Sequence, residues 1–280
     1  MATVHCGSFS INVKSSKTEQ IHQWQQGANV RQRADELAVE EPLEIRVDNH
    51  PISVTMRTPG HDAELAAGFL VSEGLIKSAA QIHKIEPHPR NPANVVNVFL
   101  APDVSINLKQ LTRHVFASSS CGLCGKATID AVRLHFPRSR SRAKVSAEML
   151  LQLPERLRQA QATFERTGGL HAAAVFDLSG KLLVLREDVG RHNAVDKVLG
   201  HGLLHGLLPF SRHILMVSGR ASFEIMQKAL AASLPIVCAV SAPSTLAVDF
   251  AREGGQTLVG FLRGNRMNIY SRPDRLEFLK

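Results

Sequence analysis

The chain is poor in cysteine and in aromatic residues. Its 280 residues include 4 cysteines, 1 tryptophan and 1 tyrosine, and aromatic residues make up 5% of the sequence. So few cysteines exclude a secreted fold held together by disulfides and favour reduced thiols in the cytoplasm. So few aromatic side chains leave few stacking platforms for single-stranded nucleic acid, and no helix-turn-helix, zinc-finger or RNP signature is present. We therefore expect a cytoplasmic protein without a nucleic-acid partner.

Long hydrophobic runs are also missing. The most apolar stretch, residues 203–208, is interrupted by His205 and Gly206 and is too short to cross a bilayer. Residues 1–12 lack the basic and then apolar segments of a signal peptide. We therefore expect neither secretion nor a membrane partner.

Basic residues outnumber acidic ones. Lys and Arg number 33 against 25 Asp and Glu, which gives a formal net charge of +8. Such a balance attracts anions. Because nucleic acid is disfavoured, a phosphate-bearing small molecule or an acidic protein partner fits this charge best.

Composition divides the chain into four parts. We predict a weakly ordered segment over residues 1–40, a smaller α+β region over 41–136, a basic linker over 137–145 and an α/β domain over 146–280. The linker prediction rests on the octet Pro-Arg-Ser-Arg-Ser-Arg-Ala-Lys, which cannot bury itself.

The α+β region opens with two alternating runs, residues 43–47 and 52–56, which predict a β-hairpin. Asp62 is expected to cap a helix that ends near Gly74. The remaining elements of this region are strands near 82–85 and 95–100 and a helix over 127–134.

The α/β domain alternates strands and helices with short connections. A helical pattern runs from residue 146 to about 166, with a kink or restart at Pro154. The expected strands cover 172–176, 182–185, 214–217, 236–240 and 257–261, and the expected helices cover 189–200, 221–233 and 244–253. This order predicts a mixed or mostly parallel sheet with helices on both faces.

Two cysteines lie three residues apart in a segment of small residues. Cys121 and Cys124 are accompanied by Gly122 and Gly125, which loosen the backbone, and by Lys126, which favours a thiolate. Zinc would need two further ligands, and the nearby histidines do not have the spacing of a common zinc site. A buried structural pair, a redox-active dithiol and a sulfur-carrying thiol all remain open on spacing alone.

Polar connections follow several of the predicted strands. Because ligands bind at the carboxyl ends of strands in open α/β sheets, these loops predict an anion-binding crevice. The residues expected to line it are Ser218, Gly219, Arg220, Ser244, Thr245, Arg263 and Arg266.

The motifs together resemble one family, the formate dehydrogenase accessory sulfurtransferases (the FdhD family). Ser-Cys-Gly-Leu-Cys-Gly-Lys over 120–126 is similar to its signature, and the resemblance extends over about 40–271. Four more segments agree in order: 58–70, 167–173, 186–197 and 260–264. Ser218-Gly-Arg and Ser241-Ala-Pro continue the match.

The resemblance implies a fold and a function. It implies a homodimer with a cytidine-deaminase-like C-terminal part. Its members take sulfur from a cysteine desulfurase and deliver it to the molybdenum cofactor, bis-molybdopterin guanine dinucleotide, for formate dehydrogenase. It implies that Cys121 carries a persulfide, that Cys124 assists, and that the cofactor, as bound substrate, meets Phe261, Leu262, Arg263, Gly264, Asn265 and Arg266.

Deaminase chemistry is not expected from the deaminase-like fold. His171-Ala172-Ala173 lacks the glutamate of the deaminase His-x-Glu motif, and Ser120 stands where a Pro-Cys-x-x-Cys motif has proline. Two other functions remain as alternatives: a cofactor-binding chaperone that moves no sulfur, and a dithiol oxidoreductase.

We predict that the cysteine pair holds no structural metal, because two further ligands at a common spacing are missing. Metal analysis of the purified protein should find less than stoichiometric zinc. Stoichiometric zinc that is released when Cys121 and Cys124 are alkylated would contradict this prediction.

Overall fold

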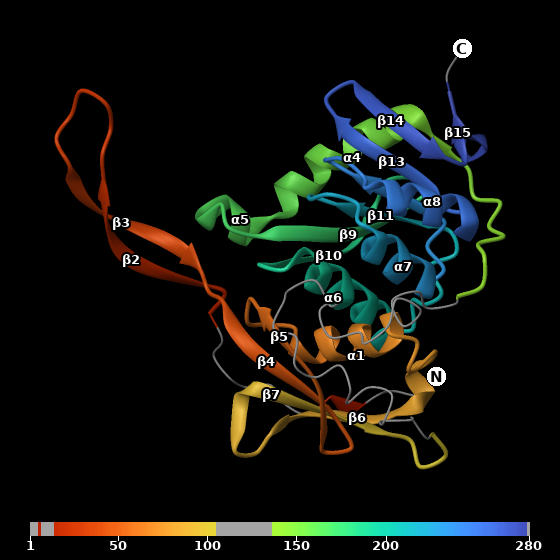
Figure 1. Cartoon of the computed structure of the whole chain (residues 1–280), viewed down its shortest axis with the longest axis horizontal. Coiled ribbons are helices and arrows are strands. Elements are labelled where there is room, and N and C mark those ends of the chain that lie inside the picture. Colours follow the sequence, from red (N-terminus) through yellow and green to blue (C-terminus); the bar gives the residue numbers. More distant parts are fainter. Residues whose placement is uncertain (1–4, 7–13, 105–135, 279–280) are drawn as a thin grey trace.

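The computed structural model of the chain describes residues 5–6, 14–104 and 136–278. The described residues form two lobes, each built on one larger sheet, and a long two-stranded arm that extends from them (Figure 1). The cysteine segment and the helix predicted over 127–134 lie outside the described residues. Within these residues, no helix is both long and apolar enough to span a membrane.

The N-terminal lobe contains a five-stranded sheet with the order β1-β6-β7-β4-β5. Its strands are β1 His5–Cys6, β4 Glu41–Val47, β5 His50–Arg57, β6 Ile82–His88 and β7 Asn91–Leu100. The predicted hairpin is confirmed, since β4 and β5 pair in antiparallel fashion. A 3-10 turn, Ala79–Gln81, precedes β6.

One helix, α1 (Asp62–Ser72), packs on this sheet and buries Leu65, Ala66 and Leu70. The predicted cap was wrong. His61 is the N-cap residue, and the carboxylate of Asp62 instead accepts hydrogen bonds from the buried Arg57 guanidinium at 2.9 and 3.0 Å. A charged partner in reach outcompetes the backbone amides for this carboxylate.

The C-terminal lobe contains a six-stranded sheet with the order β10-β9-β11-β12-β13-β14. Its strands are β9 His171–Asp177, β10 Leu182–Asp188, β11 His213–Val217, β12 Ile236–Ala239, β13 Thr257–Arg263 and β14 Arg266–Ser271. The central strands β11, β12 and β13 are parallel, and the outer pairings are antiparallel. The predicted mixed sheet is confirmed.

Helices cover both faces of this sheet, as predicted. On one face lie α6 (Arg191–Leu204), α7 (Phe223–Ala231) and α8 (Thr245–Gly254), and on the other lies α4 (Ala147–Ala160). Pro154 lies inside α4 without ending it. The helix is interrupted instead at Gln161, after which the short α5 (Ala162–Thr167) begins.

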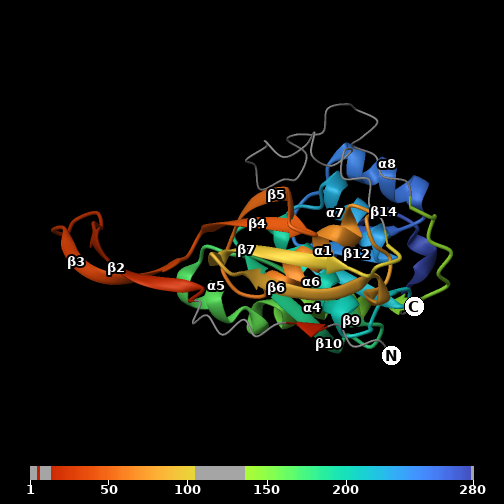
Figure 2. The ribbon, with the colours of Figure 1, turned by 90° about the horizontal axis from the view of Figure 1, so that it is seen from below.

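Residues predicted as weakly ordered form the arm. Strands β2 (Ser16–Gln23) and β3 (Arg31–Ala38) pair along their whole length and project away from both lobes (Figures 1 and 2). The sequence gives no sign of this pairing, because a two-stranded ribbon with both faces in solvent buries no core and therefore needs no hydrophobic alternation. At its base, Arg166 in α5 forms an ion pair with Glu36.

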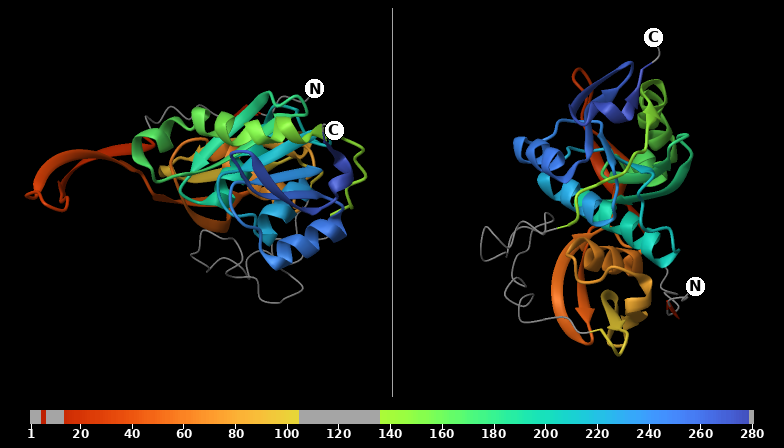
Figure 3. Two further views of the ribbon diagram at one scale, coloured as in Figure 1. Left: turned by 90° about the horizontal axis from the view of Figure 1, so that it is seen from above. Right: turned by 90° about the vertical axis from the view of Figure 1, so that its right-hand side faces the viewer.

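The predicted linker has no regular structure before residue 145 and runs along the C-terminal lobe (Figure 3). The Ser139 amide donates to the Gly254 carbonyl at 2.8 Å, and the Ser141 carbonyl accepts from the buried Arg275 guanidinium. The segment ends in β8 (Val145–Ser146), which pairs with β15 (Leu276–Glu277) after the 3-10 turn Pro273–Arg275. The domain boundaries themselves remain predictions.

The two lobes meet where α1 crosses α6. A Cβ atom on Gly68 would lie 1.7 Å from the carbonyl oxygen of Asp196, and one on Gly200 would lie 1.8 Å from that of Glu64. No side chain fits such gaps, so the helix backbones themselves are in contact. Both glycines are therefore required for the way the lobes join.

We predict that Gly200→Ala destabilises the fold by on the order of 1–3 kcal/mol or more, because the added methyl group forces the helices apart. The direction of the change in stability identifies the cause, because alanine in a helix interior is normally more favourable than glycine by roughly 0.5–1 kcal/mol. Urea unfolding followed by circular dichroism measures the free energy of unfolding.

Gly254→Ala is the matched control. Gly254 is also helical, but a Cβ there would meet side chains rather than backbone, the nearest being the end of Leu230 at 3.1 Å. Its free energy of unfolding should stay within about 1 kcal/mol of the parent. A Gly200→Ala protein as stable as the parent would show that the close crossing is not required.

Candidate functional site

The two cysteines expected to carry sulfur, Cys121 and Cys124, lie outside the described residues. Cys238 in β12 is described, and it is fully buried. Burial raises the pKa of its thiol far above the ordinary value. Cys238 is therefore a core residue that stays protonated, as its sequence context predicts.

The predicted cofactor-binding loops come together at one edge of the six-stranded sheet. The loop after β11 and the loop after β12 are joined by two hydrogen bonds, from the Ala221 amide to the Ala242 carbonyl at 3.2 Å and from the Ser244 amide to the Ala221 carbonyl at 3.1 Å. The Phe261 amide in β13 donates to the Ser241 carbonyl at 3.1 Å. Three loops from distant parts of the sequence thus form one continuous surface.

Ser244 and Thr245 lie at the start of α8. The Ser244 hydroxyl caps the helix by accepting from the Ala247 amide at 3.2 Å. Thr245 is the first helical residue and is exposed. Of this pair, the Thr245 hydroxyl is more available to a ligand, because the Ser244 oxygen already serves the helix.

Residues 261–266 form the tip of the β13–β14 hairpin. Arg263 and Arg266 lie directly opposite each other and are exposed, and the Arg263 guanidinium stacks over the Phe261 ring at 5.8 Å. Gly264 has a φ of 58°, which the turn requires. Leu262 differs from its neighbours, since its side chain is buried in the core beneath α4 and cannot contact a ligand.

Ser218 and Gly219 occupy the centre of the edge. The Ser218 oxygen accepts from the Ala172 amide at 2.8 Å, which leaves its proton free to be donated. A Cβ on Gly219 would lie 3.4 Å from Nδ1 of His171 and 3.8 Å from Cδ of Arg191. The His171 ring and the Arg191 side chain therefore both lie beside the backbone at Gly219.

Positive charge gathers around His171. Burial lowers the pKa of His171, and the positive charges of the nearby Arg191 and Arg220 guanidiniums lower it further. The imidazole is therefore neutral near pH 7. Nε of Arg191 is buried and has no hydrogen-bond partner among the described residues. Such a group of cations favours an anion between them.

Two acidic residues near this edge serve the fold. Asp188 is fully buried, forms an ion pair with Lys197 at 2.7 Å and accepts from the Thr58 amide at 3.2 Å. Asp196 is paired with Lys228 at 2.7 Å. The sequence makes both candidates to orient Arg191 or to cap α6. Their positions show that they join the lobes through buried lysines.

His192 is buried and partnered. Its Nε2 lies 3.1 Å from the Ser222 hydroxyl and 3.6 Å from a Glu224 carboxylate oxygen. From the sequence, the polar neighbours of His192 suggest a functional role, with a capping or solvent-facing histidine as the alternative. In the structure its side chain neither caps α6 nor faces solvent. Glu224 lies behind it, so His192 links α6 to α7.

A cavity of about 580 Å³ opens beside the edge. It lies between the α4–α5 junction, the start of β9 and the ends of β11 and β12. His171 and Ser218 line it at the sheet, and Gln161 and Phe164 line it at the helices. Neither Gln161 nor Phe164 carries a sequence signal of a site, because both follow an ordinary helical pattern.

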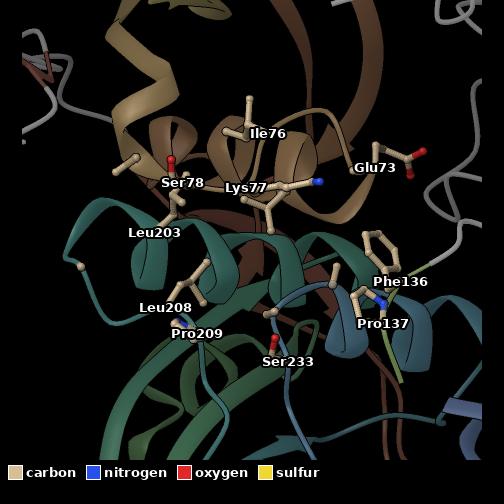
Figure 4. A pocket seen from close by; sticks show the side chains of 16 residues that line it. Glu73, Ile76, Lys77, Ser78, Phe136, Pro137, Leu203, Leu208, Pro209 and Ser233 are labelled. Atoms are coloured by element: carbon tan, nitrogen blue, oxygen red, sulfur yellow. The ribbon is translucent and has the colours of Figure 1, made fainter. Parts of the chain in front are cut away.

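A larger cavity, of about 740 Å³, lies between the lobes (Figure 4). Ile76 and Lys77 line it from the N-terminal lobe, and Leu203 and Leu208 line it from the end of α6 and the loop that follows. Phe136, at which the described chain resumes, borders the same cavity. Its lining is mainly apolar, and no sequence motif indicated it.

Glu64, His201 and His205 form a group whose geometry could accept a metal ion. Burial alone would raise the pKa of Glu64, but hydrogen bonds from His61 and Arg186 outweigh burial and hold it well below its usual range. Arg186 bonds both carboxylate oxygens, at 2.5 and 2.7 Å. The carboxylate is thus already neutralised by a guanidinium that ties β10 to α1.

Comparisons with known proteins agree with the motifs. A sulfur carrier protein FdhD from Streptomyces coelicolor is 53% identical over 256 residues, covering 88% of this chain and 91% of that protein. Proteins of the same name from Mycobacterium tuberculosis and Saccharolobus solfataricus are 49% and 44% identical over 87% of this chain, and the matches cover 92% and 91% of their lengths.

A solved structure has the same fold. The crystal structure of a formate dehydrogenase accessory protein from Desulfotalea psychrophila superposes with a TM-score of 0.76, covering 94% of this chain and 100% of that chain at 24% identity. At this identity the likeness shows a shared fold only. The cytidine-deaminase-like fold of the C-terminal part remains a prediction.

The sequence profile of the FdhD/NarQ family matches residues 38–277, which leaves most of the β2–β3 arm before the match. The motifs occur in the expected order along this range, and about half of the residues are identical to those of the named relatives. Both findings point to the same family. The chain belongs to the FdhD/NarQ family.

Proposed function

We propose that this protein is a sulfur carrier: Cys121 accepts persulfide sulfur from a cysteine desulfurase, and the sulfur passes to the molybdenum cofactor required by formate dehydrogenase. The observation that carries the proposal is the Ser-Cys-Gly-Leu-Cys-Gly-Lys segment in a chain about half identical to proteins named sulfur carriers. The acceptor is bis-molybdopterin guanine dinucleotide, which is the substrate of the transfer rather than a resident cofactor.

The thiol chemistry proceeds by exchange. The Cys121 thiolate attacks the terminal sulfur of the donor persulfide, the donor S–S bond breaks, and the donor cysteine leaves as a thiolate. Cys121 then carries the persulfide. Attack of the Cys124 thiolate on the inner sulfur forms a Cys121–Cys124 disulfide and releases the outer sulfur as sulfide. A dithiol reductant restores both thiols for the next transfer.

The cofactor is assigned to the edge formed by the three loops. Arg263 and Arg266 are exposed and opposite each other, so they repel unless an anion lies between them. A guanidinium binds a phosphate with two parallel hydrogen bonds. The edge also offers the Ser218 and Thr245 hydroxyls and the Gly219 backbone. Leu262 is left out because its side chain is buried.

The proposed function also includes an oligomeric state and a cellular location. We expect a homodimer in the cytoplasm that meets two proteins in turn, the desulfurase and formate dehydrogenase. Transfer between proteins requires an accessible thiol, and the sequence neighbours of Cys121, Ser120 and Gly122, are small. By reaction type the protein is a sulfurtransferase.

We predict that Cys121→Ala abolishes sulfur loading. Incubation with a cysteine desulfurase and cysteine should add one or more sulfur atoms, removable by reductant, to the parent protein, and intact-protein mass spectrometry detects them. The variant should gain none and should fail to activate formate dehydrogenase, because the accepting thiolate is gone.

Cys238→Ala is the control, since this thiol is buried and protonated, and its loading should equal that of the parent. Normal activation of formate dehydrogenase by Cys121→Ala would refute the sulfur-carrier function. If the parent binds the cofactor and activates the enzyme without ever gaining sulfur, the protein is a chaperone instead.

We predict that Arg263→Ala weakens binding of GDP, a fragment of the cofactor, by about 10- to 100-fold, which corresponds to a loss of ~1.5–3 kcal/mol for a charged hydrogen-bonded pair. Isothermal titration calorimetry measures the affinity. Arg266→Ala should behave alike, and both affinities should fall as salt is added.

Arg252→Ala supplies the control, because Arg252 is an exposed arginine on α8 that forms an ion pair with Asp249 at 3.7 Å. Sulfur loading and the thermal unfolding temperature should be unchanged in all three variants. Unchanged GDP affinity in both hairpin variants would place the cofactor elsewhere. Loss of loading together with binding would mean that the arginines hold the fold.

A further inference from the structure

The cavity beside the sheet edge has a polar group that the fold does not use. Gln161 is 4% exposed and lines the cavity. Its backbone amide donates to the Arg158 carbonyl, and its carbonyl accepts from the Glu165 amide. Its side-chain amide has no hydrogen-bond partner among the described residues. The amide lies at the cavity surface rather than fully enclosed, so its donor and acceptor are available to a ligand in the cavity.

The same helical side of the cavity also offers a surface suited to a flat ring. Phe164 lines it, and the Arg158 guanidinium stacks on the Phe164 ring at 4.7 Å, which holds both side chains in place. The backbone amide of Phe164 donates to Glu187 at 2.7 Å, so the residue is fixed at its base as well. Leu157 and Leu170 supply apolar surface. Aromatic walls of this kind stack on heterocycles.

The end of the cavity at the sheet is polar and leads to the cations. Ser218 and the neutral His171 line it. The His171 ring and the Arg191 side chain both lie beside Gly219, the residue that follows this serine. A ring in the cavity can therefore carry an anionic substituent toward Arg191 and Arg220.

We propose that this cavity binds a planar heteroaromatic ring that presents a hydrogen-bond donor and acceptor on adjacent atoms, as purines and pterins do, and that Gln161 recognises that edge. A primary amide offers a donor and an acceptor side by side and so matches such an edge. Phe164 stacks on the ring. Assigning the ring to the cofactor rests on the proposed function, whereas ring binding itself does not.

The test uses two probes, one that carries a pterin ring and one that carries a purine ring. Pterin-6-carboxylate is titrated by its own fluorescence, and GMP is tested by competition against it and by calorimetry. The full-length parent should bind at least one of them. Gln161→Leu keeps the volume of the side chain but removes the amide, so affinity should fall by about tenfold or more. Phe164→Leu should weaken binding similarly.

Stability separates recognition from a structural role. Because the Gln161 side-chain amide makes no hydrogen bond to the described residues, Gln161→Leu should leave the thermal unfolding temperature close to that of the parent. The control is Gln159→Leu, on the exposed side of α4, where the amide donates to Glu155, and it should leave probe affinity unchanged.

The outcomes separate this proposal from the sulfur-carrier function. Absence of binding by both probes, or equal affinity in the parent and Gln161→Leu, would overturn ring binding. Sulfur loading on Cys121 should be normal in Gln161→Leu, so a failure of ring binding leaves the sulfur-carrier function standing. Ring binding in a parent that never loads sulfur would support this cavity and refute the carrier function.

Discussion

The contact between α1 and α6 is the constraint on which the rest of this structure depends. Gly68 and Gly200 allow the two backbones to touch, and buried ion pairs then close the joint on either side. Lys197 donates to the Thr58 carbonyl as well as to Asp188, so one ammonium joins the two lobes. Such buried charges are tolerated only when every partner is in place, and removing one typically costs about 3–5 kcal/mol. The joint therefore fixes the loop before α6, and with it Arg191, at the edge of the larger sheet.

The sheet edge collects positive charge that no carboxylate among the described residues pairs with. Parallel strands β11, β12 and β13 end at the same edge, and antiparallel β9 begins there, so four connections supply side chains to one surface. Arg263 faces Arg266 across the hairpin, and Arg191 lies near the neutral His171. The buried carboxylates nearby are already paired with lysines. In the proposed function, a phosphate-bearing ligand at this edge relieves this repulsion and links the basic composition of the chain to one place on it.

The geometry also relates the cysteine segment to the joint. Val104, the last described residue before it, packs against the core of the N-terminal lobe, and Phe136, the first after it, packs against the core of the C-terminal lobe. Phe136 borders the large cavity between the lobes (Figure 4). The described residues on the two sides of the cysteine segment thus pack on different lobes, while the edge formed by the three loops belongs to the C-terminal lobe. In the proposed function, the Cys121 thiol and this edge must both contact the same molecule of the molybdenum cofactor.

The sequence by itself determined the elements and the family. Alternation at 43–47 and 52–56 and the strand–helix order after residue 170 are local patterns, so the hairpin and the mixed sheet were predicted correctly. The loops with Ser218, Thr245 and Arg263 could be placed at one edge of the sheet because strand ends are readable from hydrophobic runs. Tertiary structure alone decided the roles of Asp188 and Leu262, the break at Gln161 and the arm, because each depends on a partner distant in sequence or on the absence of a core. The unpaired amide of Gln161 has no sequence signal, since only packing determines which polar groups find partners.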